Sequence, residues 1–254
     1  MAMLQAYFDD AGTHGEALIT AIGGWVADIE AWSSAEKAWN QTLDLFRPYG
    51  VEAYHWVEVQ NKSGSWRGVP STVMPEAQFM FANALSKVRL TPIWAAVVNE
   101  DFRAFATPEF LIRYPTPLDL CYEQVMRQMY RWAAKENIGD PVLPVFSTQV
   151  SHANRMIEAY ERWGSLTDIS GFVGAISFAS YRQVIPLQCA DLIASETAKT
   201  WESREYSDGS SKWQFSRVLD KAVGEYGNLL YGGCYAETGM KVAVKRFMET
   251  LKAS

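Results

Sequence analysis

Cysteine is scarce in this sequence and its few positions are widely spaced. The chain contains three cysteines, Cys121, Cys189 and Cys234, with no Cys-x-x-Cys pair, and only three histidines. Zinc ribbons need paired cysteines, so the spacing excludes a zinc ribbon and argues against a disulfide framework. We therefore expect the three cysteines to be buried free thiols.

Long hydrophobic runs and an excess of positive charge are also missing. No apolar stretch reaches the roughly 18–20 residues that a membrane span needs, and the first residues lack the basic and apolar regions of a signal peptide. The net charge of −6 argues against a protein that coats nucleic acid through bulk positive charge. It allows an enzyme that neutralises a few phosphates with metal ions. We expect a cytoplasmic protein without a membrane partner.

The composition is that of a folded protein. Hydrophobic residues make up 48% of the chain and charged residues 20%, and the many aromatic residues can fill a sizeable core. No repeat, low-complexity tract or linker rich in Pro, Gly or Ser interrupts the sequence. We therefore expect residues 1–254 to form a single domain.

Hydrophobic periodicity predicts an α/β fold. Alternating or continuous apolar runs predict strands at 4–8, 17–27, 51–59, 91–98, 141–146 and 171–180. Helical spacing of apolar residues predicts helices at 28–46, 74–88, 117–137, 152–164, 186–205, 211–226 and 237–252. The tight turn after the first strand favours a hairpin, which predicts a mixed sheet whose first strands are antiparallel.

Two adjacent carboxylates, Asp9 and Asp10, follow the first predicted strand. An unpaired buried carboxylate costs several kcal/mol, so these acids lie either in a solvated turn or opposite a positive charge. The segment FDDAGT also invites comparison with aspartyl-phosphate hydrolases, whose strand ends in Asp-x-Asp followed by Gly-Thr. Here Ala11 occupies the position of the second acid. Because side chains alternate along a strand, the shift by one residue argues against that mechanism.

Two further polar residues stand out against apolar surroundings. Asp191 adjoins the apolar face of the predicted helix 186–205, so it either reaches solvent at an edge or has a buried partner. His55 lies within the predicted strand 51–59, where His55 and Glu58 would point to opposite faces. His55 is either a satisfied histidine of a half-buried strand or a functional group.

Three segments together resemble a known family. In order, they are YFDDAGTHG, then YHWVEV with the loop GSWRGVP, then ISFASYRQVIPLQCADLIASE. They resemble a bacterial and phage family known as domain of unknown function 3800, which is regarded as ribonuclease-H-like. The family's opening Asp-Glu-Ser-Gly is matched by residues 9–12, its histidine by His55, and its late Pro-x-Gln-x-Ala-Asp-x-x-Ala by residues 186–194. The resemblance spans roughly residues 3 to 200.

The resemblance implies a ribonuclease-H-like mixed sheet flanked by helices, with a core over about 3–200 and a helical extension over about 201–254. In such enzymes, acids from the first strand, a neighbouring strand and a late helix hold Mg²⁺ or Mn²⁺ for phosphodiester cleavage. Asp9 and Asp191 would be metal ligands, and Asp10 a ligand or a group supporting one. His55 and Glu58 would serve as acid, base or ligand. This predicts a metal-dependent nuclease acting on DNA or RNA.

The sequence departs from that family at one position that matters. Many members place an acid after the strand matched by 141–146, where this chain has Ser147. Glu58, Asp101 and Glu196 are available substitutes. The alternative is a catalytically degenerate binding or regulatory module without hydrolase activity, which Ser147 and the negative net charge favour.

Basic and aromatic residues near the motifs could contact nucleic acid. Arg67, Arg182 and Lys199 are candidates to bind phosphate, although a solvated surface charge is the more general role of such residues. Trp56 and Trp66 could stack on bases, although core packing is the more general role of tryptophan.

Overall fold

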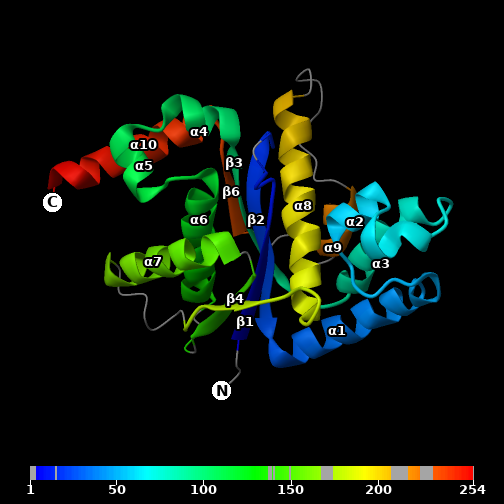
Figure 1. Ribbon diagram of the computed structural model, residues 1–254. Coiled ribbons are helices and arrows are strands. Elements are labelled where there is room, and N and C mark those ends of the chain that lie inside the picture. The colour runs from blue at the N-terminus through cyan, green and yellow to red at the C-terminus, as the bar shows by residue number, and fades with distance from the viewer. Residues whose placement is uncertain are drawn as a thin grey trace.

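The computed structural model describes residues 4–14, 16–136, 139, 141–148, 150–166, 174–206, 217–223 and 231–253. Its centre is a six-stranded sheet with the order β5-β4-β1-β2-β3-β6 (Figure 1). The strands are β1 Leu4–Ala11, β2 Ile19–Asp28, β3 Thr91–Val98, β4 Val142–Ser147, β5 Ser177–Ala179 and β6 Tyr231–Tyr235. The first three are antiparallel, whereas β4 runs parallel to β1, β5 to β4 and β6 to β3.

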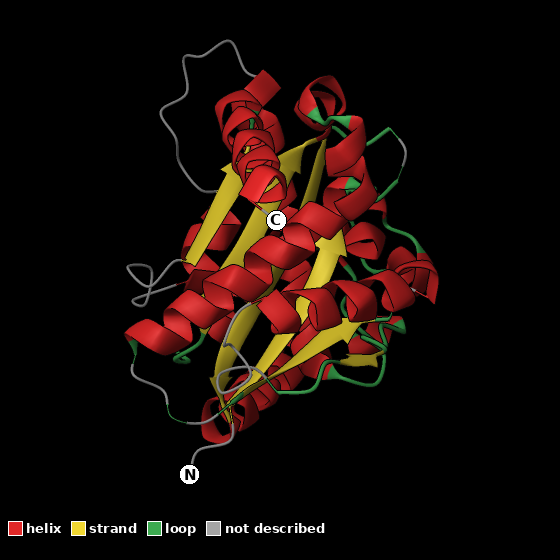
Figure 2. Ribbon diagram, turned by 90° about the vertical axis from the view of Figure 1, so that its left-hand side faces the viewer, coloured by secondary structure: helices red, strands yellow, loops and turns green. Residues whose placement is uncertain are grey.

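Helices cover both faces of the sheet. The α-helices are α1 Ile29–Asp44, α2 Trp56–Asn61, α3 Met74–Leu85, α4 Asn99–Phe105, α5 Pro108–Arg113, α6 Pro117–Lys135, α7 Val150–Leu166, α8 Ile185–Tyr206, α9 Arg217–Val223 and α10 Glu237–Ala253, with 3-10 turns η1 Arg47–Tyr49 and η2 Gly64–Gly68. Helix α8 packs on β1 and β2 from one side, where α1 also contacts β2 and α3 packs on α1. Helices α6 and α7 lie on the other side, where Figure 2 shows them in front of the sheet. In the described part of the chain, no helix is long and apolar enough to cross a membrane.

The predicted α/β class is confirmed, and most elements lie close to their predicted positions. Strand 91–98 is found as predicted, and the helix predicted at 28–46 is α1, which Asp28 caps by accepting a 2.7 Å hydrogen bond from the backbone N–H of Ala31. Strand β6, which extends the sheet at the β3 edge, was not predicted. The predictions at 171–173, 211–216 and 224–226 lie outside the described residues.

Two predictions about the site-bearing segments are wrong. Strand β1 continues to Ala11, so Asp9 and Asp10 lie within the strand and not in the turn after it. Residues 51–59 do not form a strand: α2 begins at Trp56, with His55 as its N-cap. The backbone N–H of Tyr54 donates to the side chain of Gln188 on α8 instead of to a neighbouring strand. This tie to α8 overrides the β propensity of the segment.

The core has an aromatic half beneath α1 and α3. The rings of Trp39, Tyr54, Trp66 and Phe81 contact one another there, and Trp66 is fully buried with its Nε1 donating to the carbonyl of Ala53. Trp66 is therefore a core residue and does not present a ring for base stacking. The cysteines are free as predicted; Cys121 and Cys189 are buried, whereas Cys234 is partly exposed.

Candidate active site

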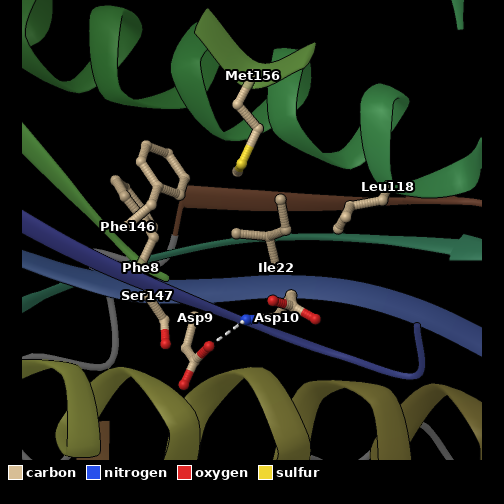
Figure 3. Close-up of a pocket in the computed structure, with 8 residues that line it drawn as sticks. All are labelled: Phe8, Asp9, Asp10, Ile22, Leu118, Phe146, Ser147 and Met156. Carbon is tan, nitrogen blue, oxygen red and sulfur yellow. Dashed lines mark hydrogen bonds between the residues drawn. The ribbon is translucent and has the colours of Figure 1, made fainter. Parts of the chain in front are cut away.

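Asp9 is placed by β1 on the face of the sheet that α8 covers. Figure 3 shows the side chains of Asp9 and Ser147, from the neighbouring strands β1 and β4, pointing toward the same helix. One oxygen of Asp9, Oδ1, accepts a 2.9 Å hydrogen bond from the backbone N–H of Asp10, and the hydroxyl of Ser147 donates to the same carboxyl group. Two local donors thus orient this acid.

Glycine in β2 lets α8 approach the sheet beside Asp9. Gly23 pairs with Asp9 across the hairpin, and a Cβ built on Gly23 would lie 2.6 Å from the backbone nitrogen of Ala194. No side chain fits at this position, so the backbone of α8 rests directly on the strand. The helix thereby brings Asp191, one turn before Ala194, close to β1.

Asp191 is buried, with an exposed fraction of 4%. The interpretation in which it reaches solvent at a helix edge is therefore wrong. Its Oδ2 accepts a 2.7 Å hydrogen bond from the backbone N–H of Trp56, and its Oδ1 accepts a 3.1 Å bond from the hydroxyl of Ser195. Each oxygen keeps a lone pair for a further partner.

Burial and neighbouring groups shift the pKa of both carboxyl groups. Burial raises the pKa of Asp9 well above its ordinary value, and the negative charges of Asp191 and Asp10 raise it further, against the hydrogen bonds from Asp10 and Ser147. Burial also raises the pKa of Asp191, although His55, the N–H of Trp56 and Ser195 oppose that shift. Ionisation of both acids is therefore unfavourable, and a proton on one of them or a cation beside them would relieve the repulsion.

Asp10 points away from this pair, because successive side chains alternate along a strand. It lines a small pocket with Phe8, Ile22, Leu118 and Met156 on the face covered by α6 and α7 (Figure 3). Among the described residues, no group of three or more His, Cys, Asp or Glu side chains is gathered so as to hold a metal ion. The acids facing α8 therefore form a pair rather than a triad.

His55 and Glu58 lie together, contrary to the expectation for a strand. In the first turn of α2 they are three residues apart on one face, with Nδ1 of His55 3.8 Å from Oε1 of Glu58. This Nδ1 is buried and makes no hydrogen bond within the described part of the chain. The His55 ring stacks on Tyr181 with centroids 4.7 Å apart and planes at 15°. The histidine is therefore not the satisfied core residue of the simpler interpretation.

The glycine-rich loop after α2 is built around Glu58. Oε2 of Glu58 accepts hydrogen bonds from the backbone N–H and the hydroxyl of Ser65, at 3.0 and 3.1 Å. Gly64 has φ +54° and a Cβ there would lie 2.3 Å from this carboxylate, so the loop closes tightly over it.

The two arginines predicted to bind phosphate differ in position. Nη2 of Arg182 lies 3.9 Å from Oε1 of Glu58, and its guanidinium covers the Tyr181 ring at 5.7 Å, with most of the side chain exposed. Arg182 thus stands at the rim of the site. Arg67 is exposed on η2, and no hydrogen bond or ion pair joins it to the described acids.

Of the three proposed substitutes for the missing acid, none lies where Ser147 contacts Asp9. Glu196 is fully buried, accepts a 3.1 Å hydrogen bond from Nε1 of Trp56, and lies 3.9 Å from Nζ of Lys199. Asp101 lies on α4 beside Glu237 of α10, and Glu58 is held by Ser65.

Gln188 is the residue that sequence reasoning left without a role. Its Oε1 accepts from Nε1 of Trp39 and from the backbone N–H of Tyr54, at 3.0 and 2.9 Å, and its Nε2 donates to the carbonyl of Tyr181 at 2.9 Å. It fixes the segments that carry His55 and Tyr181 to α8. Its place beside apolar helix positions could have indicated this role, because a buried amide needs hydrogen-bond partners.

Comparison of the sequence with protein-family models finds no matching family, and no curated protein matches the chain.

Proposed function

We propose that the protein is a divalent-metal-dependent nuclease that hydrolyses phosphodiester bonds, with Asp9 and Asp191 as its metal ligands. The pairing of these two carboxyl groups between β1 and α8 carries the proposal. Asp191 is buried and Asp9 is half-buried, and the charge of Asp191 raises the pKa of Asp9. A cation between them would relieve the repulsion and favour ionisation of both groups.

The chemistry of the donors fits one hard cation. The two carboxylates are accompanied by the hydroxyls of Ser147 and Ser195, so the groups available are oxygens. Mg²⁺ is commonly held by one or two carboxylates while water and phosphate complete its shell, and Mn²⁺ accepts the same ligand types. A pair of acids therefore suits a single ion, and Ser147 of β4 adds no third acid.

The resemblance to the ribonuclease-H-like family supports the same assignment. That resemblance implies acids from the first strand and a late helix, and those two positions are Asp9 and Asp191. They come from segments 182 residues apart, the difference between positions 191 and 9 in the chain.

The residues around the pair would hold and protonate the reacting groups. The N–H of Trp56 and the hydroxyl of Ser195 fix the orientation of Asp191, while Asp10 N–H and Ser147 fix Asp9. A bound ion would polarise a phosphoryl oxygen and lower the pKa of a water nucleophile. His55, whose side chain is 32% exposed, would transfer a proton at the leaving oxygen, and Arg182 would contact an adjacent phosphate.

A second candidate is a binding or regulatory module without hydrolase activity. Ser147 in place of an acid, and the absence of a three-member acid group among the described residues, favour it. In that case Asp9 and Asp191 share a proton instead of a cation.

Thermal melting with and without Mn²⁺ tests the metal site without a choice of substrate. The wild type, Asp9→Asn and Asp191→Asn would be compared, with Asp44→Asn as a control because Asp44 pairs with Arg47 on the surface. A ligand at 100 times its Kd stabilises by about 2.7 kcal/mol, which corresponds to a rise in Tm of roughly 5–10 °C. We expect that rise in the wild type and the control, and its loss in both site variants.

Cleavage assays then separate the two candidates. Labelled single-stranded and duplex DNA and RNA would be incubated with Mn²⁺ and with EDTA, using the same four proteins. Metal-dependent cleavage that both site variants lose supports the nuclease. No rise in Tm at millimolar Mn²⁺ contradicts the metal site and supports the module. A rise without cleavage of any substrate keeps the metal site and contradicts the nuclease activity.

A further inference from the structure

A second cavity lies at the end of the sheet where β1 finishes. Its volume is about 430 Å³, within the range of small-molecule sites. Its walls come from the turn after β1, from α4 and from the segment that opens α6. Neither the acids nor His55 contribute to these walls, so the cavity is separate from the site described above.

The cavity adjoins the acids through the chain and through a shared side chain. Gly12, Thr13 and His14 line it and follow Asp10 directly in sequence. Leu118 lines both this cavity and the small pocket that contains Asp9 and Asp10. A ligand that fills the cavity would therefore end close to Asp10, whose side chain lies on the same face of the sheet as Leu118.

Hydrogen bonds make its floor rigid. The hydroxyl of Thr20 donates to Oδ1 of Asn99 at 2.9 Å, and Nδ2 of Asn99 donates to the carbonyl of Ala17 at 2.8 Å. Gly12 has φ +69°, and a Cβ there would lie 1.8 Å from the carbonyl oxygen of Ile19, so only glycine fits this wall. The cavity is thus largely formed before any ligand arrives.

The side chains of the cavity suit an anion with an apolar body. Arg103 is the one charged residue in the described wall, and His14 is the one other basic group. Both are exposed, and neither side chain makes a hydrogen bond or ion pair within the described part of the chain. Much of the remaining wall is apolar, from Ala106, Leu111 and two prolines, Pro115 and Pro117.

We infer that this cavity binds one unpaired nucleotide of a nucleic-acid strand, with its phosphate at Arg103 and His14 and its base against the apolar wall. The volume admits a single nucleotide unit rather than a base pair. Arginine supplies a planar fork of donors that matches phosphate, and the apolar face of a base is removed from water when it packs against apolar side chains. The choice of a nucleic-acid strand rests on the proposed function, whereas the cavity and its charge do not.

Calorimetric titration in EDTA tests this inference without any metal. AMP and UMP would be compared with adenosine and uridine, and then with six-residue single strands of DNA and RNA. We expect both monophosphates to bind, each at least about tenfold more tightly than its nucleoside. Tighter binding of the single strands than of the mononucleotides would place the site on a strand, and equal binding would assign it to free nucleotides.

Two variants and a matched control locate the binding. Arg103→Ala should remove the preference for the phosphate, and Ala106→Trp should fill the cavity and abolish binding of all ligands. Arg89→Ala changes an exposed arginine at the other end of β3 and should bind like the wild type. Because Arg103 is exposed, its removal should not impair folding. Arg103→Ala therefore tests whether the phosphate binds in this cavity even if Ala106→Trp misfolds.

Absence of nucleotide binding at millimolar concentration would overturn the inference, as would binding that Arg103→Ala leaves unchanged. Either result leaves the Mn²⁺-dependent rise in Tm untouched, because that measurement uses no nucleotide. A wild type that binds nucleotides but shows no Mn²⁺ response would retain the cavity and refute the metal site.

Discussion

Gly23 of β2 and Ala194 of α8 meet without any side chain between them. A Cβ built on Gly23 would lie 2.7 Å from Cα of Ala194 and 2.9 Å from the carbonyl carbon of Ile193. Both of these are backbone atoms, which cannot rotate away. The distance between α8 and the sheet, and with it the approach of Asp191 to Asp9, depends on this one glycine.

Gly23→Ala should therefore destabilise the protein and weaken its response to metal. Overpacking of this kind costs about 1–3 kcal/mol, or roughly 2–12 °C in Tm for a domain of this size. Since α8 must move outward, the Mn²⁺-dependent rise in Tm should also shrink. Gly139→Ala is the matched control, because Gly139 is exposed and its Cβ would meet nothing within 4 Å. A Gly23→Ala protein that melts like the wild type would refute the close packing.

The elements that the sequence predicts well have a strong local signal. Strand β3 is an unbroken apolar run between a turn and a helix, and α1 repeats buried Trp32, Ala35, Trp39 and Leu43 at helical spacing behind an Asp cap. Strand β6 was missed because YGGCY contains two glycines, which lower strand propensity. It forms because β3 offers a free edge, which is a tertiary effect.

The sequence singled out the acids of the candidate site, Asp9 and Asp191, but it did not predict how His55 and Glu58 lie beside them. The motif around Asp191 singles it out because a carboxylate beside an apolar helix face demands a partner. The prediction that His55 and Glu58 point to opposite faces of a strand was wrong. Gln188, more than 130 positions away, holds Tyr54 by a hydrogen bond, and α2 begins directly after His55. A local sequence pattern cannot predict a hydrogen bond to a side chain that is distant in the sequence. The separation of Asp10 from Asp9 follows from strand alternation once β1 is known to include both.

Asp9→Asn should raise the metal-free Tm at neutral pH. The pKa of Asp9 is higher in the folded than in the unfolded chain, where it is about 3.9. Below that pH the carboxyl is protonated in both states and does not change the free energy of unfolding. As the pH rises above it, the unfolded chain ionises first, so the folded state loses relative stability until the folded-state pKa is passed.

The difference in Tm between Asp9→Asn and the wild type should thus be small near pH 4 and grow toward pH 8 in EDTA. Each 1 kcal/mol corresponds to about 2–4 °C here. Asp44→Asn serves as the comparison, because this exposed acid pairs with Arg47 at 3.2 Å and such pairs contribute about 0–1 kcal/mol. An Asp9→Asn protein less stable than the wild type over the whole range would mean that the ionised carboxylate has a stabilising partner without metal.

Ser147→Asp should convert the acid pair into a triad. The hydroxyl of Ser147 already reaches the carboxyl group of Asp9, so an aspartate in its place would add a negative oxygen ligand on the same side of the sheet. Without metal, the added charge should lower Tm through repulsion. With metal, affinity rises with the number of charged ligands, and we expect half-maximal stabilisation at about tenfold less Mn²⁺, a gain of about 1.4 kcal/mol. Ser147→Asn has nearly the same size without the charge and should show neither effect. Unchanged Mn²⁺ dependence in Ser147→Asp would mean that the cation does not bind between β1, β4 and α8.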